Sequence, residues 1–267
     1  MPLTVNEHYA ASAACFLGGV LSCVTHLWML VDFLPKIRMR SSLRSMHVQL
    51  CVANLMVVAF FALGAVSHFE RRWIFGDFIC KFYTFWCKFS PILAVGLLAA
   101  CLFAEYQHAS DPSLAKKDQP YRLSTLFAWL NAILWGAGSL IWSRYGVEPA
   151  GFSCVVYWYE VQPYVTYMSL FGFGLPFMIA IYYAFTLWST GLTIGNPMAK
   201  ATIGVMFTLA LQFSGYLFGF IYAFCGYTLS HYAIAFAQIW TKSLGVAHPF
   251  VYSNMLAEET PSSVKKE

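Results

Sequence analysis

The chain has 267 residues, of which 59% are hydrophobic, 18% aromatic and only 10% charged, and its formal net charge is +4. A soluble globular domain usually carries about 25% charged residues. These proportions exclude an ordinary soluble protein and indicate a polytopic membrane protein. No basic cluster with interleaved aromatic residues lies outside the apolar segments, so nucleic acid is not expected as a partner and the lipid bilayer is.

Seven apolar runs follow one another along the chain, each close to the ~20 residues that an α-helix needs to cross the hydrocarbon core. The predicted helices are Tyr9–Phe33, His47–Ser67, Cys80–Tyr106, Leu123–Trp142, Pro163–Trp188, Ala199–Cys225 and Tyr232–Leu256. They predict an all-α integral membrane protein, with a single seven-transmembrane-helix domain over residues 1–267. The first run has no short basic leader and no small-residue cleavage site, so we expect a retained helix there.

Basic residues follow the first and third runs and lie beyond the seventh. They are Lys36, Arg38, Arg40, Arg44, Lys116, Lys117, Arg122, Lys265 and Lys266. The opposite loops mix arginine with acidic residues, namely Arg71, Arg72 and Arg144 with Glu70, Asp77, Glu148 and Glu160. Since cytoplasmic loops carry the excess of lysine and arginine, we expect the N-terminus outside, the C-terminus in the cytoplasm, and a multi-pass protein of the cell membrane.

Two of the eight cysteines stand apart from the rest. Most cysteines lie inside apolar runs, where a cysteine usually serves as a small hydrophobic residue. Cys80 instead begins the third predicted helix and Cys154 lies in the loop after the fourth, both on the predicted outer side. An oxidising compartment allows a disulfide between them, which would pin that loop over the mouth of the bundle. Two free thiols are the alternative.

Lys242 lies near the middle of the last apolar run, where a cation costs about 3 kcal/mol. An intramembrane lysine is therefore a candidate functional residue. His248-Pro249 begins six residues later and interrupts helical hydrogen bonding, and Tyr252 follows three residues after Pro249. This spacing resembles the seventh helix of animal (type II) opsins, which are rhodopsin-like (class A) G-protein-coupled receptors. In opsins the lysine forms a Schiff base with retinal.

Two further stretches carry the same resemblance. Residues 73–81, WIFGDFICK, are similar to the start of the third helix in rhodopsin-like receptors, and WSRY at 142–145, followed by Glu148 and Ser153-Cys154, resembles the second extracellular loop of opsins. The resemblance implies that Glu148 is the counterion of the Schiff base, as in bistable opsins. It also places Tyr83 among the residues that contact retinal, at a position where invertebrate opsins have tyrosine, which agrees with Glu148 as the counterion.

A lysine and a carboxylate are the residue types that this chemistry needs. In a dry pocket the neutral amine is favoured and its lone pair can attack an aldehyde. The cation formed when the product is protonated then requires a carboxylate within a few ångströms. Lys242 can supply the amine and Glu148 the charge. The alternative is a structural ion pair that joins the last helix to the loop.

The resemblance also implies a pocket. In the sixth predicted helix, QFSGY at 212–216 matches the Cys-Trp-Leu-Pro-Tyr of the family, which places Phe213 and Tyr216 beside retinal. Met168 and Phe173 match positions near the ionone ring. A polyene needs a long, apolar and aromatic pocket, although aromatic residues at helical spacing are equally typical of ordinary packing between helices.

The chain also departs from the opsin pattern. Lys88 lies two turns after Cys80, at or near the pocket, where opsins do not usually carry a base. It can compete for Glu148, repel a protonated Schiff base, or turn outward. At the end of the third predicted helix, Ala104-Glu105-Tyr106 replaces the family's acidic residue, arginine and tyrosine. Because that arginine engages the G protein, coupling to a heterotrimeric G protein is in doubt.

Other site classes have little support. The seven histidines show no His-x-x-x-His spacing, and there is no phosphate-binding glycine loop and no Gly-x-Ser-x-Gly turn, so we expect no metal site and no enzyme of these classes.

Three hypotheses about function remain. The one favoured is an opsin-like receptor that holds retinal, 11-cis or all-trans, as a Schiff base and transduces a light signal. The second is a retinal photoisomerase of the retinochrome or peropsin type, without G-protein coupling. The third is an opsin-derived chemoreceptor for a diffusible ligand, as in divergent nematode serpentine receptors.

Overall fold

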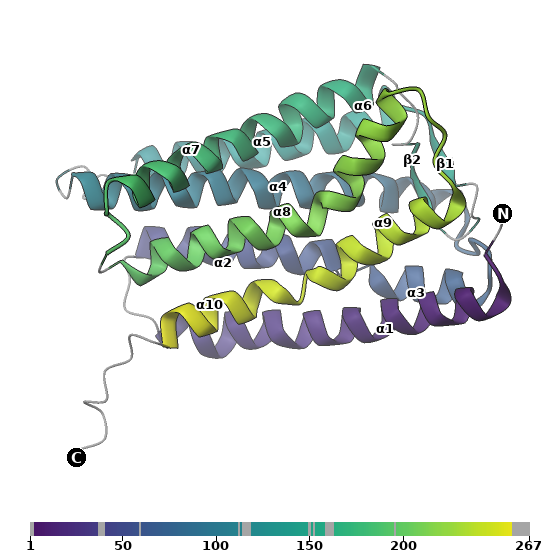
Figure 1. Ribbon diagram of the computed structural model, residues 1–267, viewed down its shortest axis with the longest axis horizontal. Helices are drawn as coiled ribbons and strands as arrows, with labels where there is room; N and C mark the ends of the chain where they lie inside the picture. The colour runs from purple at the N-terminus through teal and green to yellow at the C-terminus, as the bar shows by residue number, and fades with distance from the viewer. Residues whose placement is uncertain are drawn as a thin grey trace, which may run out of the picture.

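The chain forms a bundle of long helices that run roughly along one axis, with a small two-stranded sheet at one end (Figure 1). This is a computed structural model, and it describes residues 3–36, 41–58, 60–111, 113, 119–148, 151, 153–157, 163–194 and 196–257. The elements are α1 (Val5–Trp28), η1 (Met29–Phe33), η2 (Leu34–Lys36), α2 (Ser41–Val58), α3 (Phe61–Phe69), α4 (Gly76–Ser110), α5 (Gln119–Ile141), β1 (Tyr145–Val147), β2 (Cys154–Val156), α6 (Pro163–Tyr167), η4 (Met168–Gly174), α7 (Leu175–Ser189), α8 (Pro197–Phe224), α9 (His231–Leu244) and α10 (Ala247–Ala257).

Each predicted apolar run is helical, but four of the predicted helices are divided, the first of them into α1 and the π-helical η1. The second consists of α2 and α3, and the fifth contains the π-helical segment η4 between α6 and α7. The seventh separates into α9, which ends at Leu244, and α10, which begins at Ala247. Pro249 explains this last break, because proline has no N–H and its ring clashes with the carbonyl four residues earlier.

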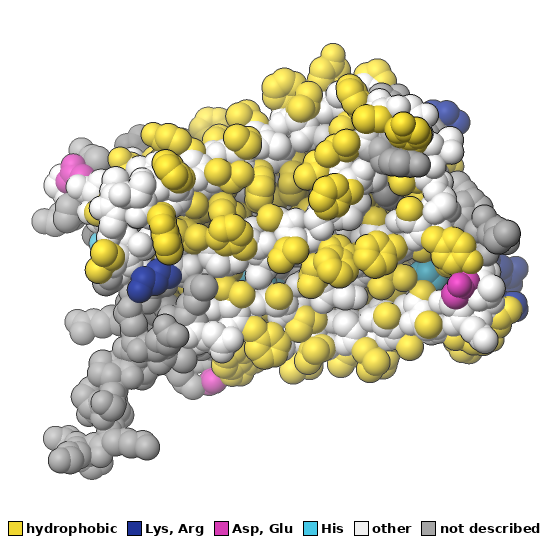
Figure 2. Space-filling view, viewed as in Figure 1, with side chains coloured by type: hydrophobic (Ala, Val, Ile, Leu, Met, Phe, Trp, Pro, Cys, Tyr) yellow, Lys and Arg dark blue, Asp and Glu magenta, His cyan; other side chains and the backbone are white. Residues whose placement is uncertain are grey.

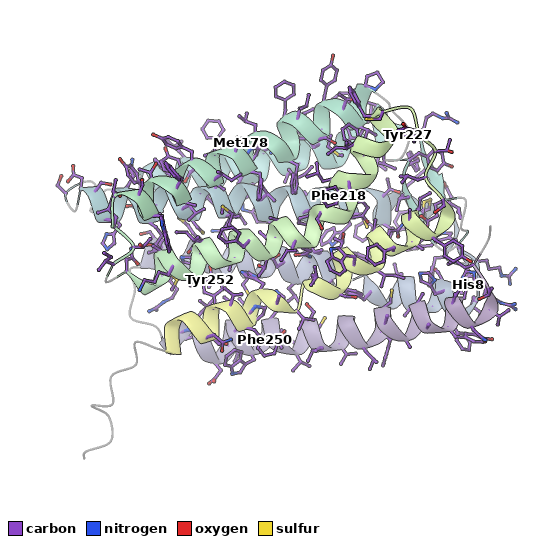
Figure 3. The ribbon with its side chains drawn as sticks, in the orientation of Figure 1. His8, Met178, Phe218, Tyr227, Phe250 and Tyr252 are labelled. Atoms are coloured by element: carbon purple, nitrogen blue, oxygen red, sulfur yellow. A yellow bond between two sulfur atoms is a disulfide. The ribbon has the colours of Figure 1, made fainter. Side chains whose placement is uncertain are left out.

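The outer surface of the bundle is apolar along its middle. On the face shown in Figure 2, hydrophobic side chains cover the centre, whereas the charged side chains lie near the two ends. Met178 and Phe218, both labelled in Figure 3, are 61% and 68% exposed. Among the described residues, six helices are long and apolar enough to cross a bilayer. In a bilayer, the backbone polar groups must be hydrogen-bonded within each helix, and the side chains that face lipid must be apolar. Helices with apolar outer surfaces meet both requirements, which indicates a multi-pass membrane protein.

Helix α4 forms the centre of the bundle, with α2, α5, α7 and α8 packed around it. Its middle is fully buried, including Leu93, Leu97 and Leu102. Gly96 lets α5 approach closely, because a Cβ atom at this position would lie 3.2 Å from the Cα atom of Ala128. Small residues at such contacts are typical of helix packing within membranes.

A hydrogen bond between helices accommodates the irregular fifth span. Pro176 has no N–H to donate to the carbonyl of Gly172, four residues earlier. The side chain of Asn131 in α5 donates to that carbonyl at 3.0 Å, and Trp135 donates to Asn131 in turn. This contact holds η4, which carries two of the predicted pocket residues, against α5.

The start of α1 and the end of α10 lie at opposite ends of the bundle, and the sheet lies at the end where α1 starts (Figure 1). The side of the membrane that each end faces stays a prediction. Most of the basic residues on which that prediction rests lie outside the described part of the chain, namely Arg38, Arg40, Lys116, Lys117, Lys265 and Lys266.

Candidate functional site

The disulfide and the sheet define one end of the site. Cys80, in the second turn of α4, is bonded to Cys154, the first residue of β2, and their Cα atoms are 5.2 Å apart. Strand β1 pairs antiparallel with β2, with Val147 opposite Cys154. Because β1 is paired with β2, the disulfide attaches both strands to α4. Glu148, the residue after β1, is thereby held over the bundle.

Glu148 is buried, with only 2% of its surface exposed, and it is hydrogen-bonded to helix α9. Its Oε2 atom accepts from Nε2 of Gln238 at 2.5 Å, and its Oε1 atom accepts from the hydroxyl of Ser153 at 2.7 Å. The same hydroxyl lies 2.8 Å from Oε1 of Gln238. A buried carboxylate is stable only with such partners. The sequence interpretation assigned no role to Gln238.

Lys242 follows Gln238 by four residues, which is about one helical turn. Its backbone belongs to α9, but its side chain lies outside the described part of the structure. The pairing of Lys242 with Glu148 therefore stays a prediction. Glu148 is bonded to the turn of α9 that precedes Lys242.

A cavity of about 140 Å³ lies between α4, β2, the fifth span and α8. Four of the five residues that the resemblance placed beside retinal line it, namely Met168, Phe173, Phe213 and Tyr216, and Phe173 meets Phe213 edge to face with ring centroids 5.2 Å apart. The described lining residues are Cys87, Lys88, Pro91, Ile92, Val155, Met168, Ser169, Phe173, Phe213, Tyr216, Leu217 and Phe220. This composition, mostly apolar with a few polar groups, is typical of a site for an apolar small molecule.

Tyr83 is not among the described residues that line this cavity. It is 1% exposed and belongs to a neighbouring apolar cluster that contains both disulfide cysteines and Ala237 of α9. Its ring lies 5.5 Å from that of Trp73. Tyr83 therefore packs between the disulfide and α9, beside the cavity.

Lys88 does line the cavity, which decides one of the alternatives that the sequence left open. Its Nζ atom lies 5.8 Å from the centroid of the Tyr216 ring, and both side chains border the same space. The amine therefore does not turn outward to lipid. Among the described side chains it forms no ion pair.

A second buried polar network lies at the opposite end of the bundle, around the residue that replaces the arginine of the family. Glu105 is 1% exposed; its Oε1 atom lies 3.4 Å from Nε2 of His47, and its Oε2 atom accepts from Asn196 at 3.1 Å. The other ring nitrogen of His47 lies 2.6 Å from the hydroxyl of Tyr252, which Figure 3 places far from His8. The network joins α2, α4, α10 and the segment before α8.

We expect Glu105→Ala to lower the free energy of unfolding by about 2 to 3 kcal/mol, because His47 and Asn196 then lose a buried partner. The unfolding of purified protein during a titration with denaturing detergent measures this. Glu70→Ala, at an exposed position, is the matched control and should change little. Equal effects of the two substitutions would show that the network contributes no stability.

Comparison with known proteins identifies relatives of this chain, although no protein-family model matches it. A G0-coupled rhodopsin of Mizuhopecten yessoensis is 32% identical over 149 residues, which is 54% of this chain and 37% of that protein. Melanopsin of Homo sapiens is 24% identical over 285 residues, covering 93% of this chain and 59% of that protein. The chain thus spans less than two thirds of the length of these relatives.

The fold agrees with a solved structure. The crystal structure of squid rhodopsin matches over 99% of this chain and 88% of that one, with a TM-score of 0.80 at 16% sequence identity. At this identity the match shows the seven-helix fold, in which α9 and α10 together take the place of the seventh helix. With the opsin relatives, it confirms the resemblance found in the motifs. The relatives found for this chain are thus opsins, and its fold is that of squid rhodopsin.

Proposed function

We propose that this protein is a light-sensing opsin-like receptor that holds retinal as a Schiff base at Lys242, with Glu148 as the counterion. Bound retinal would supply light absorption and photoisomerisation. Lys242 would hold it, Glu148 would carry the compensating charge, and Met168, Phe173 and Phe213 would exclude water. The proposal includes a single receptor domain with the N-terminus outside, the C-terminus in the cytoplasm, and the cell membrane as its location.

The observation that carries the proposal is the hydrogen bond between Glu148 and Gln238. It brings a buried carboxylate onto α9 one turn before the lysine, which is where a cation formed at Lys242 needs an anion. The cavity lined by Met168, Phe173 and Phe213 supplies the apolar surroundings that a polyene needs. The opsin relatives support retinal as the ligand.

Specific features favour the two other candidate functions. Glu105, buried and hydrogen-bonded in the place of the arginine that engages G proteins, favours a photoisomerase that needs no G protein. Lys88, with its amine in the cavity, favours a chemoreceptor whose ligand is polar at one end.

Incubation of the expressed protein with 11-cis and with all-trans retinal tests the proposal. An absorption spectrum is recorded, and the linkage is then trapped in acid, reduced with borohydride and located by peptide mass spectrometry. A visible band with retinal fixed at Lys242 supports the proposal. The isomer preference, with light-dependent nucleotide exchange on added G proteins, separates a receptor from a photoisomerase. Absence of any band in monodisperse, disulfide-bonded protein contradicts retinal binding and favours the chemoreceptor.

We expect Glu148→Gln to keep retinal attached but to move most of its absorption from the visible to the near ultraviolet at neutral pH. A glutamine retains hydrogen-bonding capacity towards Ser153 and Gln238 but no negative charge, so the protonated linkage loses its counterion. Spectra recorded from acid to neutral pH measure this. Glu70→Gln, at an exposed position, should behave as wild type. An unchanged visible band in Glu148→Gln would assign the counterion elsewhere.

A further inference from the structure

Lys88 has no role in the proposed attachment of retinal to Lys242, yet its amine lies in the same cavity as the predicted pocket residues. Its Nζ atom is 5.8 Å from the centroid of the Tyr216 ring, and both residues line the cavity. Lys88 forms no ion pair with any described side chain. The amine is therefore available to whatever fills the cavity.

The surroundings of Lys88 favour a reactive amine. Transfer of a charge to an apolar environment is costly unless an anion accompanies it. The described lining contains no carboxylate, and most of it is aromatic or aliphatic, including Ile92, Met168 and Phe173. The face of the Tyr216 ring lies 5.8 Å from the amine, and the stabilisation that such a contact gives a cation is modest. A neutral lysine with a free lone pair is a nucleophile for carbonyl groups.

The cavity also adjoins the helix that carries Lys242. Tyr216 packs against both the central core and the cluster that contains Ala237 of α9. Next to it, Gly215 allows α8 to contact α9 closely, because a Cβ atom there would lie 3.1 Å from the Cα atom of Ala237. A long ligand in the cavity that extends past Tyr216 towards α9 would therefore lie between the helices that carry the two lysines.

We propose that Lys88 is a second covalent attachment site for an elongated apolar aldehyde such as retinal. The amine nitrogen bonds to the aldehyde carbon, the carbon–oxygen double bond is replaced by a carbon–nitrogen double bond, and the oxygen leaves as water. This inference rests on the proposed function, because it takes the same class of ligand. Without a carboxylate in the described lining, the product at Lys88 stays neutral and absorbs in the near ultraviolet.

The test uses the full chain in detergent with 11-cis and all-trans retinal, borohydride reduction, and quantification of retinyl groups on each lysine peptide. Four proteins are compared: wild type, Lys242→Ala, Lys88→Met and the double variant. We expect Lys242→Ala to carry retinyl on Lys88, about tenfold more than on the exposed Lys200, which serves as the internal control for non-specific labelling. Lys88→Met should lose that label only, and the double variant should lose both.

Failure of this inference is distinguishable from failure of the proposed function. Label on Lys242 alone in wild type, with none on Lys88 in folded Lys242→Ala, overturns the inference and leaves the proposed function intact. Label on Lys88 alone supports the inference and overturns attachment at Lys242. No label on either lysine overturns both, and equal label on Lys88 and Lys200 overturns the inference. A monodisperse preparation that yields the disulfide-linked Cys80–Cys154 peptide is taken as folded. If Lys88→Met does not fold, Lys88→Arg, which keeps the charge, is used in its place.

Discussion

Lys242→Ala is expected to abolish the visible absorption band that the wild-type protein forms with retinal. Alanine has no amine, so no linkage can form on α9 beside the turn that binds Glu148. Any product at Lys88 would lack a described carboxylate in the cavity and would absorb in the near ultraviolet, outside the band that is measured. The effect is therefore the loss of the whole visible band, read from the difference spectrum before and after bleaching with hydroxylamine.

The matched control for this experiment is Lys200→Ala, which removes an exposed lysine from α8. It should form pigment as the wild type does. A visible band of normal intensity in Lys242→Ala would assign the attachment to another lysine and overturn the central claim of the proposed function.

Cys154→Ser is expected to lower the free energy of unfolding by about 4 kcal/mol, because the disulfide closes a loop between residues 74 positions apart and restricts the unfolded chain. The pigment yield should fall as well. The bond holds β2 against α4, and the pairing of β2 with β1 positions Glu148. Unfolding during a titration with denaturing detergent gives the stability, and the visible absorbance per mole of folded protein gives the yield.

Cys225→Ser controls for the loss of a thiol as such, since Cys225 is an exposed free cysteine. It should shift the free energy of unfolding by less than about 0.5 kcal/mol, as exposed substitutions usually do. If Cys154→Ser behaved in the same way, the disulfide would have no structural role in the mature protein, and the position of Glu148 would depend on its hydrogen bonds alone.

The sequence by itself indicated the apolar spans, the membrane class and the resemblance to opsins. Hydrophobicity over ~20 residues is a local property that directly reports the length of a spanning helix. The pairing of Cys80 with Cys154 and the break before Pro249 also depend on features that are visible in the chain, namely the predicted sidedness of two loops and the missing N–H of a proline. The residue spacing around Lys242 was enough to indicate the opsin family, because a lysine inside a spanning helix is rare.

Only the tertiary structure decided which polar groups meet. Glu148 is hydrogen-bonded to Gln238, which lies 90 residues further along the chain, and Glu105 contacts His47, which lies 58 residues earlier. No local sequence pattern encodes such partners. The direction of Lys88 was equally open, because a lysine on a helix can point to lipid, to a carboxylate or into a cavity. Packing of α4 against α8 placed its amine over Tyr216 and settled the question. The physical reason is that hydrophobic spacing fixes each helix alone, whereas the site depends on how separate helices fit together.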